Sequence, residues 1–261
     1  MSTYVRTSGK NSWKAGGNQV DISIVIPAFN EEKKICFDVQ VAAVFIDEEA
    51  MLGEVIVVDD GSADKTAEEA RNVEVPSAVE RIVIRLEKNR GKGFAVKTGI
   101  LASKGEVVLF ADSGTCVPYP NALAQIKRIR GRELDIAMAS RRLKETVIHR
   151  NRSVKRRLLS SFFRLVARII TCVPNRFSDT QCGFKIYRGE IARELFGKCV
   201  TTGFLFELEV LLRALKRGDR IEEFPVEWTC DLDTRLRPGS AAVEVLKEMF
   251  QVRSIIKKDK E

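Results

Sequence analysis

Histidine is almost absent from this sequence of 261 residues, and His149 is its only example. The six cysteines are scattered, and no two of them form a C-x-x-C pair: Cys36, Cys116, Cys172, Cys182, Cys199 and Cys230. Because structural zinc sites need four cysteine or histidine ligands at short spacing, we do not expect one here. Scattered cysteines in a chain of this length indicate reduced thiols and a cytoplasmic protein.

Long apolar runs are also missing. No stretch reaches the ~20 apolar residues of a membrane-spanning helix, and residues 1–17 lack the apolar core of a signal peptide. We therefore expect a soluble or peripheral protein, with residues 1–20 disordered because they are mostly small and polar. Aromatic residues make up only 7% of the chain and no aromatic stacking motif is present, so we expect no nucleic-acid partner.

What the chain does have is positive charge and a large apolar fraction. Its 44 Lys and Arg residues outnumber 36 Asp and Glu residues, which gives a net charge of +8 at pH 7. Such a surplus favours an anionic partner, which could be nucleic acid, anionic lipid or a phosphorylated substrate, and we rank nucleic acid below phosphorylated ligands. A hydrophobic content of 44% supports a sizeable core, which we expect to be one α/β domain over residues 21–258.

Apolar segments and helical patterns alternate at short spacing along the chain. The expected strands are 22–28, 54–62, 81–86, 105–112, 134–141 and 221–228. Pro225 places the last of these at a sheet edge. The expected helices begin near Asn30, as an N-cap, and near Asp64, and cover about 94–103, 189–196, 206–217 and 240–256. This alternation predicts a mostly parallel sheet with helices on both faces.

Polar residues follow most of these strands: Asn30 and Glu31, Asp59 and Asp60, Asp112, and Arg141. In open α/β sheets, ligands bind beyond the carboxyl ends of the strands, so these residues are candidates for a binding site. Acids in these places also cap helices and form turns, which is the alternative interpretation for Glu31 and Asp60. Lys92 lies in a Gly-rich loop, 89–93, and a solvated turn is its alternative.

The stretch 177–187 carries an acid, an amide, a glycine and a lysine within seven positions: Asp179, Gln181, Gly183 and Lys185. A core strand does not need that set of residues, whereas a site that holds a charged ligand near a carboxylate does. Structural pairing within the loop remains the alternative for Gln181 and Lys185.

Residues 149–173 mix basic side chains with apolar ones at helical spacing. A basic amphipathic helix of this kind, at about 152–172, can lie on a membrane surface. An ordinary helix that covers the sheet explains the same pattern, so both interpretations stay open.

Three motifs resemble the nucleotide-sugar half of family 2 glycosyltransferases with the GT-A fold: VIPAFNE at 25–31, VDDGSAD at 58–64 and NRGKG at 89–93. DTQCGFK at 179–185, together with Ser140-Arg141, is similar to the polyprenyl-phosphate branch of that family. Within the branch, dolichyl-phosphate β-glucosyltransferases are more similar than dolichol-phosphate mannose synthases. The resemblance covers about 22–258 and implies a Rossmann-like GT-A domain.

The resemblance implies a nucleotide-sugar site. In it, Pro27, Phe29 and Glu31 would line the base and ribose, and Asp60 would accept hydrogen bonds from the base. Carboxylates suit these positions because ribose hydroxyls and base N–H groups are donors. The cation of Lys92 would meet the diphosphate.

The resemblance also implies a metal site, with one departure. In the family, an Asp-x-Asp motif holds Mg²⁺ or Mn²⁺ against the diphosphate. Asp112 occupies the first position of this motif, but Gly114 stands where the second acid is expected. Three explanations stay open: Asp112 suffices with waters, another acid such as Asp179 completes the shell, or metal dependence is weak.

The acceptor side is implied to carry these residues: Arg141, Arg150 and Arg152 at the phosphate, with Gln181 and Lys185 in support. Guanidinium groups suit phosphate oxygens. Asp179 and Asp112 are the expected catalytic residues. Asp179 would position the acceptor or the metal first and act as a base only second, because a phosphate monoester is already largely dianionic at neutral pH.

The implied reaction is the inverting transfer of a hexose to polyprenyl or dolichyl phosphate at the cytoplasmic face of a membrane. UDP-glucose is the favoured donor and GDP-mannose the next, with peripheral membrane contact through about 152–172. Two alternatives remain. One is a family 2 glycosyltransferase with a non-lipid acceptor, and the other is an inactive nucleotide-sugar-binding subunit, which Gly114 supports.

Overall fold

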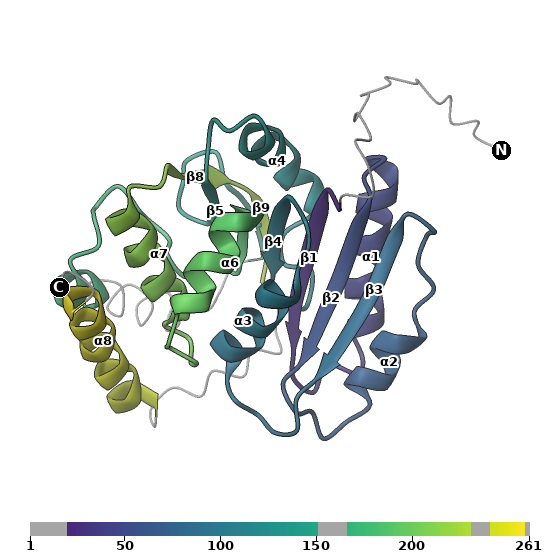
Figure 1. Cartoon of the computed structure of the whole chain (residues 1–261), viewed down its shortest axis with the longest axis horizontal. Coiled ribbons are helices and arrows are strands. Elements are labelled where there is room, and N and C mark those ends of the chain that lie inside the picture. The colour runs from purple at the N-terminus through teal and green to yellow at the C-terminus, as the bar shows by residue number, and fades with distance from the viewer. Residues whose placement is uncertain (1–19, 151–165, 231–240, 259–261) are drawn as a thin grey trace.

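The computed structural model describes residues 20–150, 166–230 and 241–258. Its centre is a seven-stranded sheet in the order β3-β2-β1-β4-β7-β5-β8, and β6 and β9 form a separate two-stranded sheet (Figure 1). The strands are β1 (Ile22–Ala28), β2 (Gly53–Asp59), β3 (Val79–Arg85), β4 (Val107–Ala111), β5 (Ile136–Ser140), β6 (Val147–Arg150), β7 (Phe184–Arg188), β8 (Ile221–Pro225) and β9 (Glu227–Thr229). The helices are α1 (Ile35–Glu48), α2 (Thr66–Asn72), α3 (Lys92–Ala102), η1 (Tyr119–Ala122), α4 (Leu123–Arg130), α6 (Gly189–Lys198), α7 (Phe206–Arg217) and α8 (Ala241–Lys258).

The central sheet is mostly parallel, as predicted. β1 pairs in parallel with β2 and β4, β2 with β3, and β5 with β8. Only β7 among these seven strands runs antiparallel to its neighbours, β4 and β5. Every residue of β2 and β4 is buried, which is the pattern of parallel strands covered on both faces.

Helices cover both faces of the sheet (Figure 1). On one face α1, η1 and α4 pack over a cluster in which the rings of Phe45 and Tyr119 stack with their centroids 5.6 Å apart. On the other face α3, α6, α7 and α8 contribute buried side chains such as Val96, Phe196 and Met249 to a second cluster. The two clusters fix the sheet between two helical layers and leave its carboxyl edge open to ligands.

The first helix begins later than predicted, at Ile35. Asn30 has a left-handed φ of 51° and does not form an N-cap. Its Oδ1 accepts a hydrogen bond from the Ala63 N–H (2.8 Å), and its own N–H donates to Ser62 Oγ (2.7 Å). The prediction of Asn30 as an N-cap is therefore wrong, because asparagine tolerates the left-handed region and here joins the ends of β1 and β2.

The segment predicted as one final edge strand forms two strands. β8 lies at the edge of the large sheet, in agreement with Pro225, whereas β9 pairs with β6. No strand is predicted where β7 lies, at Phe184–Arg188, although four of its five residues are buried. The charged Lys185, the second residue of this strand, interrupts the apolar pattern by which a buried strand is predicted.

Residues 166–171 are helical and form the described end of the basic segment. Ala167 and Ile170 are buried in the cluster that includes α6 and α7, while Ile169 is exposed. This end of the segment therefore covers the core. The rest of it, 151–165, and the tail 1–19 lie outside the described residues, and within the described ranges no helix is both long and apolar enough to cross a bilayer.

Gly99 and Gly197 offer a matched pair of substitutions. An added Cβ at Gly99, in α3, would overlap Val25 and lie 3.0 Å from Val58, whereas nothing lies within 4 Å of a Cβ at Gly197, in α6. We expect Gly99→Ala to lower the free energy of unfolding by about 1–3 kcal/mol through overpacking. Gly197→Ala should raise it by about 0.5–1 kcal/mol through helix propensity. Urea denaturation of both variants measures these effects, and equal stabilities would show that α3 does not pack this closely.

Candidate active site

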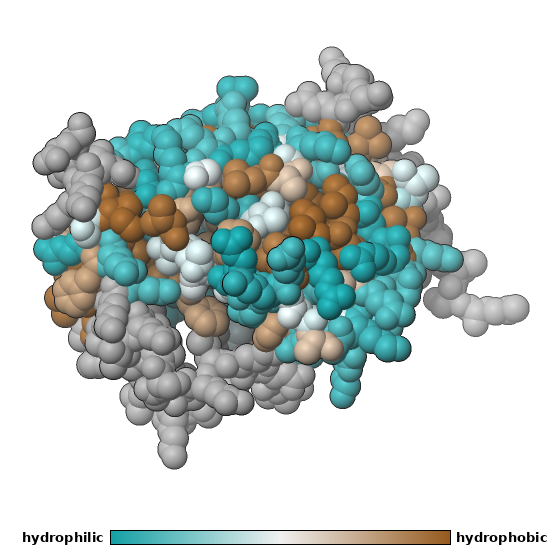
Figure 2. All heavy atoms as spheres, turned by 60° about the horizontal axis from the view of Figure 1, so that its bottom comes forward, coloured by the Kyte–Doolittle hydropathy of each residue, from teal (hydrophilic) through white to brown (hydrophobic). Residues whose placement is uncertain are grey.

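The polar ends of the central strands meet at one edge of the sheet, the lower edge in Figure 1. Because β1, β2 and β4 are parallel, the residues that follow them lie side by side there. A pocket of about 150 Å³ opens at this edge, and it is lined by Ala111, Asp112, Ser113, Thr115, Cys116, Val117, Tyr119, Arg141, Cys182, Gly183, Phe184, Trp228 and Cys230. Figure 2 brings this side of the molecule forward and shows hydrophobic groups lying among hydrophilic side chains.

Asp112 directly follows β4 and lies over Gly183. The Asp112 N–H donates to the Gly183 carbonyl oxygen (2.8 Å). An added Cβ at Gly183 would lie closer than 3.0 Å to the Asp112 carboxylate atoms, a separation that real Cβ atoms essentially never show. The glycine of the DTQCGFK motif thus makes room for the predicted metal ligand.

Lys92 is the first residue of α3 and takes part in a chain of charges instead of a solvated turn. Its Nζ lies 2.8 Å and 3.0 Å from the two Asp112 oxygens and 3.6 Å from Glu207 Oε1. Glu207 also pairs with Lys185, which is buried and donates to the Cys182 carbonyl oxygen (2.7 Å). Burial disfavours the charged form of Lys92, but the charges of Asp112 and Glu207 outweigh it and raise the pKa of Lys92. Lys185 therefore pairs within the protein, while Lys92 remains charged beside Asp112, which lines the pocket.

Asp38 of α1 holds the turn that follows Asp112. Its carboxylate accepts hydrogen bonds from Ser113 Oγ (2.9 Å), the Gly114 N–H (2.9 Å) and Thr115 Oγ1 (2.6 Å). Gly114 has a φ of 95°, which a glycine adopts without strain. Burial raises the pKa of Asp38 in spite of these bonds. Sequence reasoning missed Asp38, because one acid in a helix carries no sign of a partner on another element.

Asp60 holds the Gly-rich loop. Its two carboxylate oxygens accept hydrogen bonds from the N–H groups of Arg90 (2.7 Å) and Gly91 (2.9 Å), and burial raises the pKa of Asp60. On the opposite side, the Phe94 N–H donates to the Thr202 carbonyl oxygen (3.2 Å). These contacts are the ones that the turn-forming interpretation of Asp60 predicts. A hydrogen bond from a nucleotide base would use the remaining lone pairs of the Asp60 carboxylate.

The other predicted nucleotide residues lie at the end of β1. Pro27, Phe29 and Glu31 are each partly buried, and the Glu31 N–H donates to Thr66 Oγ1 at the start of α2 (2.7 Å). Asp60 follows the neighbouring strand β2, which pairs with β1 as far as Ala28. The structure thus brings all four predicted residues to adjacent strand ends.

Arg141 and Asp179 form a bidentate ion pair. Nε of Arg141 lies 2.6 Å from Oδ2 and Nη2 lies 2.7 Å from Oδ1, and the Arg141 N–H adds a third bond (3.1 Å). Burial opposes the charged form of Asp179, but the hydrogen bonds and charge of Arg141 outweigh it and hold the pKa of Asp179 at about 2. Arg141 thus engages both Asp179 oxygens, and Arg141 itself lines the pocket.

Glu223 of β8 fixes the turn that carries Asp179. Its Oε1 accepts hydrogen bonds from the N–H groups of Ser178 (2.8 Å) and Asp179 (2.7 Å), and its Oε2 accepts one from Ser178 Oγ (2.6 Å). Sequence reasoning missed this acid too, since Glu223 lies 44 residues from Asp179 along the chain. The turn is therefore held from two sides, by Glu223 and by Arg141.

The remaining predicted acceptor residues are less defined. The carbonyl oxygen of Gln181 accepts a hydrogen bond from Arg141 Nη2 (2.8 Å), while its Nε2 is buried without a hydrogen-bond partner in the described part of the chain. Arg150 ends β6, but its side chain lies outside the described residues, as does all of Arg152.

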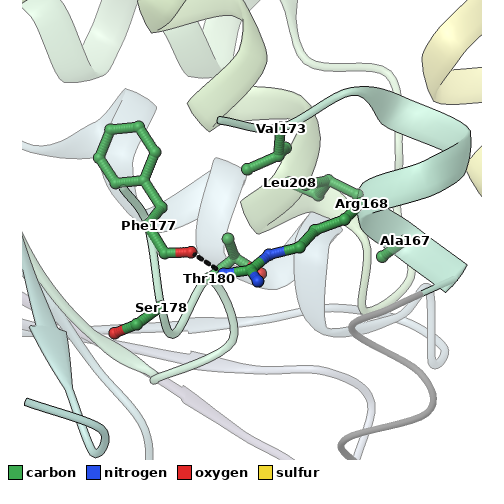
Figure 3. A pocket seen from close by; sticks show the side chains of 7 residues that line it. All are labelled: Ala167, Arg168, Val173, Phe177, Ser178, Thr180 and Leu208. Carbon is green, nitrogen blue, oxygen red and sulfur yellow. Dashed lines mark hydrogen bonds between the residues drawn. The ribbon is translucent and has the colours of Figure 1, made fainter. Parts of the chain in front are cut away.

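A second cavity, of about 10 Å³, lies beside the same turn (Figure 3). The guanidinium group of Arg168 borders it and donates to the Phe177 carbonyl oxygen (2.6 Å). Its lining is Ala167, Arg168, Val173, Phe177, Ser178, Thr180 and Leu208. A cavity of this size admits about one water molecule, so the larger pocket is the candidate substrate site.

The residues at the pocket fit a divalent cation only in part. The described ranges contain no group of three or more His, Cys, Asp and Glu side chains that could hold a metal ion. Asp112 offers one carboxylate, and the Lys92 ammonium group lies against both of its oxygens. Mg²⁺ commonly binds through one or two carboxylates together with substrate phosphates and waters. The site therefore fits a cation that arrives with a diphosphate, but not a preformed protein cage.

A parallel α/β sheet with a charged pocket at its carboxyl edge defines a ligand-binding α/β protein. The family model described as glycosyl transferase family 2 matches residues 23–196. The chain therefore belongs to glycosyl transferase family 2 and is a glycosyltransferase.

Relatives and solved structures agree with this assignment. A dolichyl-phosphate beta-glucosyltransferase of Dictyostelium discoideum is 31% identical over 247 residues, which cover 90% of this chain and 75% of the relative. The protein of the same name from Homo sapiens is 32% identical over 243 residues, with 89% and 74% covered. Glucosyl-3-phosphoglycerate synthase from Mycobacterium tuberculosis, solved with Mn²⁺ and UDP-glucose, has the same fold, with a TM-score of 0.61 at 19% identity over 91% of this chain and 79% of that one. The predicted family and GT-A fold are thus confirmed.

Asp179→Asn is expected to abolish sugar transfer and to leave nucleotide binding intact, because an amide cannot form the bidentate ion pair with the Arg141 guanidinium group that lines the pocket. It also leaves a largely buried cation unpaired, which should lower the free energy of unfolding by about 3–5 kcal/mol. Turnover, nucleotide titration and urea denaturation measure the three effects. Unchanged turnover would remove Asp179 from the site.

The double variant Arg141→Met with Asp179→Leu is the matched control. It should regain most of the stability, since apolar residues can replace a buried ion pair at little cost, and it should remain inactive. The pH dependence adds a second check on the single variant. A carboxylate with a lowered pKa contributes stability that is present above its unfolded pKa of ~3.9 and is lost as the pH falls toward about 2. The destabilisation by Asp179→Asn should therefore be full near neutral pH and shrink below about pH 4.

Proposed function

We propose that this chain transfers a hexose, with glucose as the first candidate, from a UDP-sugar to dolichyl or polyprenyl phosphate with inversion at the anomeric carbon. The observation that carries the proposal is that Asp112 and Arg141 line one pocket at the carboxyl edge of the sheet. One is a carboxylate suited to a cation–diphosphate complex, and the other is a guanidinium group suited to an acceptor phosphate. The names of the two relatives described above supply the acceptor class and the sugar.

The donor half of the proposal rests on the ends of β1 and β2. Pro27, Phe29, Glu31 and Asp60 lie together there, next to the Gly-rich loop that carries Lys92. The carboxylates would accept hydrogen bonds from ribose hydroxyls and the base N–H, and Lys92 would face the diphosphate. The solved structure with UDP-glucose supports UDP as the nucleotide.

The acceptor phosphate can act as the nucleophile without a strong base. A phosphate monoester is largely dianionic at neutral pH, and Asp179, with a pKa of about 2, is a poor proton acceptor. One oxygen of the lipid phosphate attacks the anomeric carbon while the bond from that carbon to the diphosphate breaks, so the nucleoside diphosphate leaves with the bonding electrons. An α-linked donor thus gives a β-linked lipid phosphate sugar.

Arg141 holds the acceptor in this mechanism, and Asp179 and Glu223 hold Arg141 and its turn. Lys92 offsets negative charge on the leaving diphosphate. A Mg²⁺ or Mn²⁺ ion bound at Asp112 would supply further charge neutralisation to the leaving group.

Contact with the cytoplasmic face of a membrane through about 152–172 belongs to the same proposal. A net charge of +8 suits an anionic lipid surface. Ile169, Val200, Phe204 and Phe250 are exposed apolar side chains, of the kind that can enter the interfacial layer. Such contact would bring the pocket to the depth at which a lipid phosphate emerges.

A nucleoside-diphosphate release assay tests the proposed reaction. It combines short-chain dolichyl phosphate with a panel of UDP- and GDP-sugars, in Mg²⁺, Mn²⁺ or EDTA. We expect UDP release that requires both UDP-glucose and the lipid phosphate, because the phosphate is the nucleophile.

Other outcomes of that assay would point to the alternatives. Nucleoside-diphosphate release that occurs without the lipid phosphate but requires a saccharide would indicate a non-lipid acceptor. Nucleotide binding without release from any donor would indicate an inactive subunit, which Gly114 in place of an acid supports.

A further inference from the structure

The Lys92 ammonium group lies against the carboxylate of Asp112, the one acid at which a divalent cation is expected. It touches both Asp112 oxygens, at 2.8 Å and 3.0 Å, and lies 3.6 Å from Glu207 Oε1. The rings of Phe110 and Phe206 lie 5.3 Å and 5.9 Å from the same nitrogen. The ammonium group thus sits between two carboxylates and two aromatic rings.

Apart from Asp112, the described residues offer few ligands to a divalent cation beside Lys92. Gly114 contributes no carboxylate, and Asp38, the nearest acid to that turn in the hydrogen-bond network, is taken up by Ser113, Gly114 and Thr115. A divalent ion bound to Asp112 would also lie close to the positive charge of Lys92, which itself contacts Asp112 at 2.8 Å. Two positive charges this close repel each other strongly in a partly buried site. A diphosphate changes this balance, because its oxygens supply both ligands and negative charge.

We propose that Lys92 and the divalent cation compete for Asp112, so that the cation binds firmly only together with the nucleotide diphosphate. This inference rests on the proposed function, because it takes the donor to be a nucleoside diphosphate sugar. Glu207 is the residue that makes the exchange possible. When the cation takes Asp112, Lys92 keeps Glu207 as a partner and stays beside the diphosphate.

Glu207 acts here as a positioning residue. It pairs with Lys185 as well as with Lys92, and both it and Lys185 are buried. Lys92 lies between the carboxylates of Asp112 and Glu207. Without its positive charge, both carboxylates would be available to a cation that binds between them. Two carboxylates with water are a better site for Mn²⁺ than one carboxylate that is already paired.

Electron paramagnetic resonance titration of Mn²⁺ into the full chain tests the competition, since the signal of free Mn²⁺ falls on binding. Without nucleotide, we expect Lys92→Met to bind Mn²⁺ roughly tenfold or more tightly than the wild type, because a neighbouring like charge has been removed. With UDP, the wild type should bind Mn²⁺ firmly. Lys104→Met is the matched control, because Lys104 is an exposed lysine paired only loosely with Glu80 (3.7 Å), and it should behave like the wild type.

Further variants keep the test decisive. Lys92→Gln replaces Lys92→Met if the latter fails to fold, as judged by circular dichroism. Adding Asp112→Asn to Lys92→Met should abolish the new Mn²⁺ binding, which assigns it to this carboxylate. Equal Mn²⁺ affinity of the wild type and Lys92→Met without nucleotide would overturn the proposal, as would firm Mn²⁺ binding by the wild type alone.

The same samples separate this inference from the proposed function. Calorimetric titration with UDP and with GDP reports whether a nucleoside diphosphate binds at all. If neither binds while Lys92→Met still gains Mn²⁺ affinity, the competition stands and the donor assignment fails. If UDP binds but Lys92→Met gains no Mn²⁺ affinity, the competition fails and the donor assignment stands.

Discussion

Four alternating charges beneath the carboxyl edge of the sheet tie the active site together. Asp112, Lys92, Glu207 and Lys185 come from the end of β4, the start of α3, α7 and β7, and each contacts the next. Lys185 and Glu207 are both buried, and breaking a buried ion pair costs about 3–5 kcal/mol. β7 and α7 therefore cannot separate without leaving an unpaired charge in the core. The pocket therefore depends on the assembly of elements that are distant in the sequence.

Three other acids at this edge accept hydrogen bonds from backbone N–H groups, so their carboxylates fix loops of the protein. Asp38 holds the turn after β4, Asp60 the Gly-rich loop and Glu223 the turn that carries Asp179. Loops that are fixed in advance lower the entropic cost of binding a substrate. The substrates would then bring the reactive charge, since the acceptor phosphate is dianionic and the pKa of Asp179 is too low for a base.

The strands and the site edge could be predicted because buried parallel strands are continuous apolar runs followed by polar residues. β7 could not, since it contains Lys185, whose burial depends on Glu207 in another helix. Asp38 and Glu223 could not be predicted for the same reason, because a hydrogen bond between residues far apart in the sequence leaves no local pattern. Asn30 was misassigned for a different reason, namely that asparagine serves both helix N-caps and left-handed turns.

The anomeric configuration of the product would show whether the proposed transfer to a lipid phosphate proceeds with inversion. UDP-glucose labelled with carbon-13 at C1 would be incubated with dolichyl phosphate and the full chain, and the lipid product would be examined by carbon and phosphorus NMR. We expect a β-linked glucosyl phosphate in which the labelled carbon couples to the phosphorus of the lipid. An α-linked product, or labelled free glucose beside unchanged dolichyl phosphate, would contradict it.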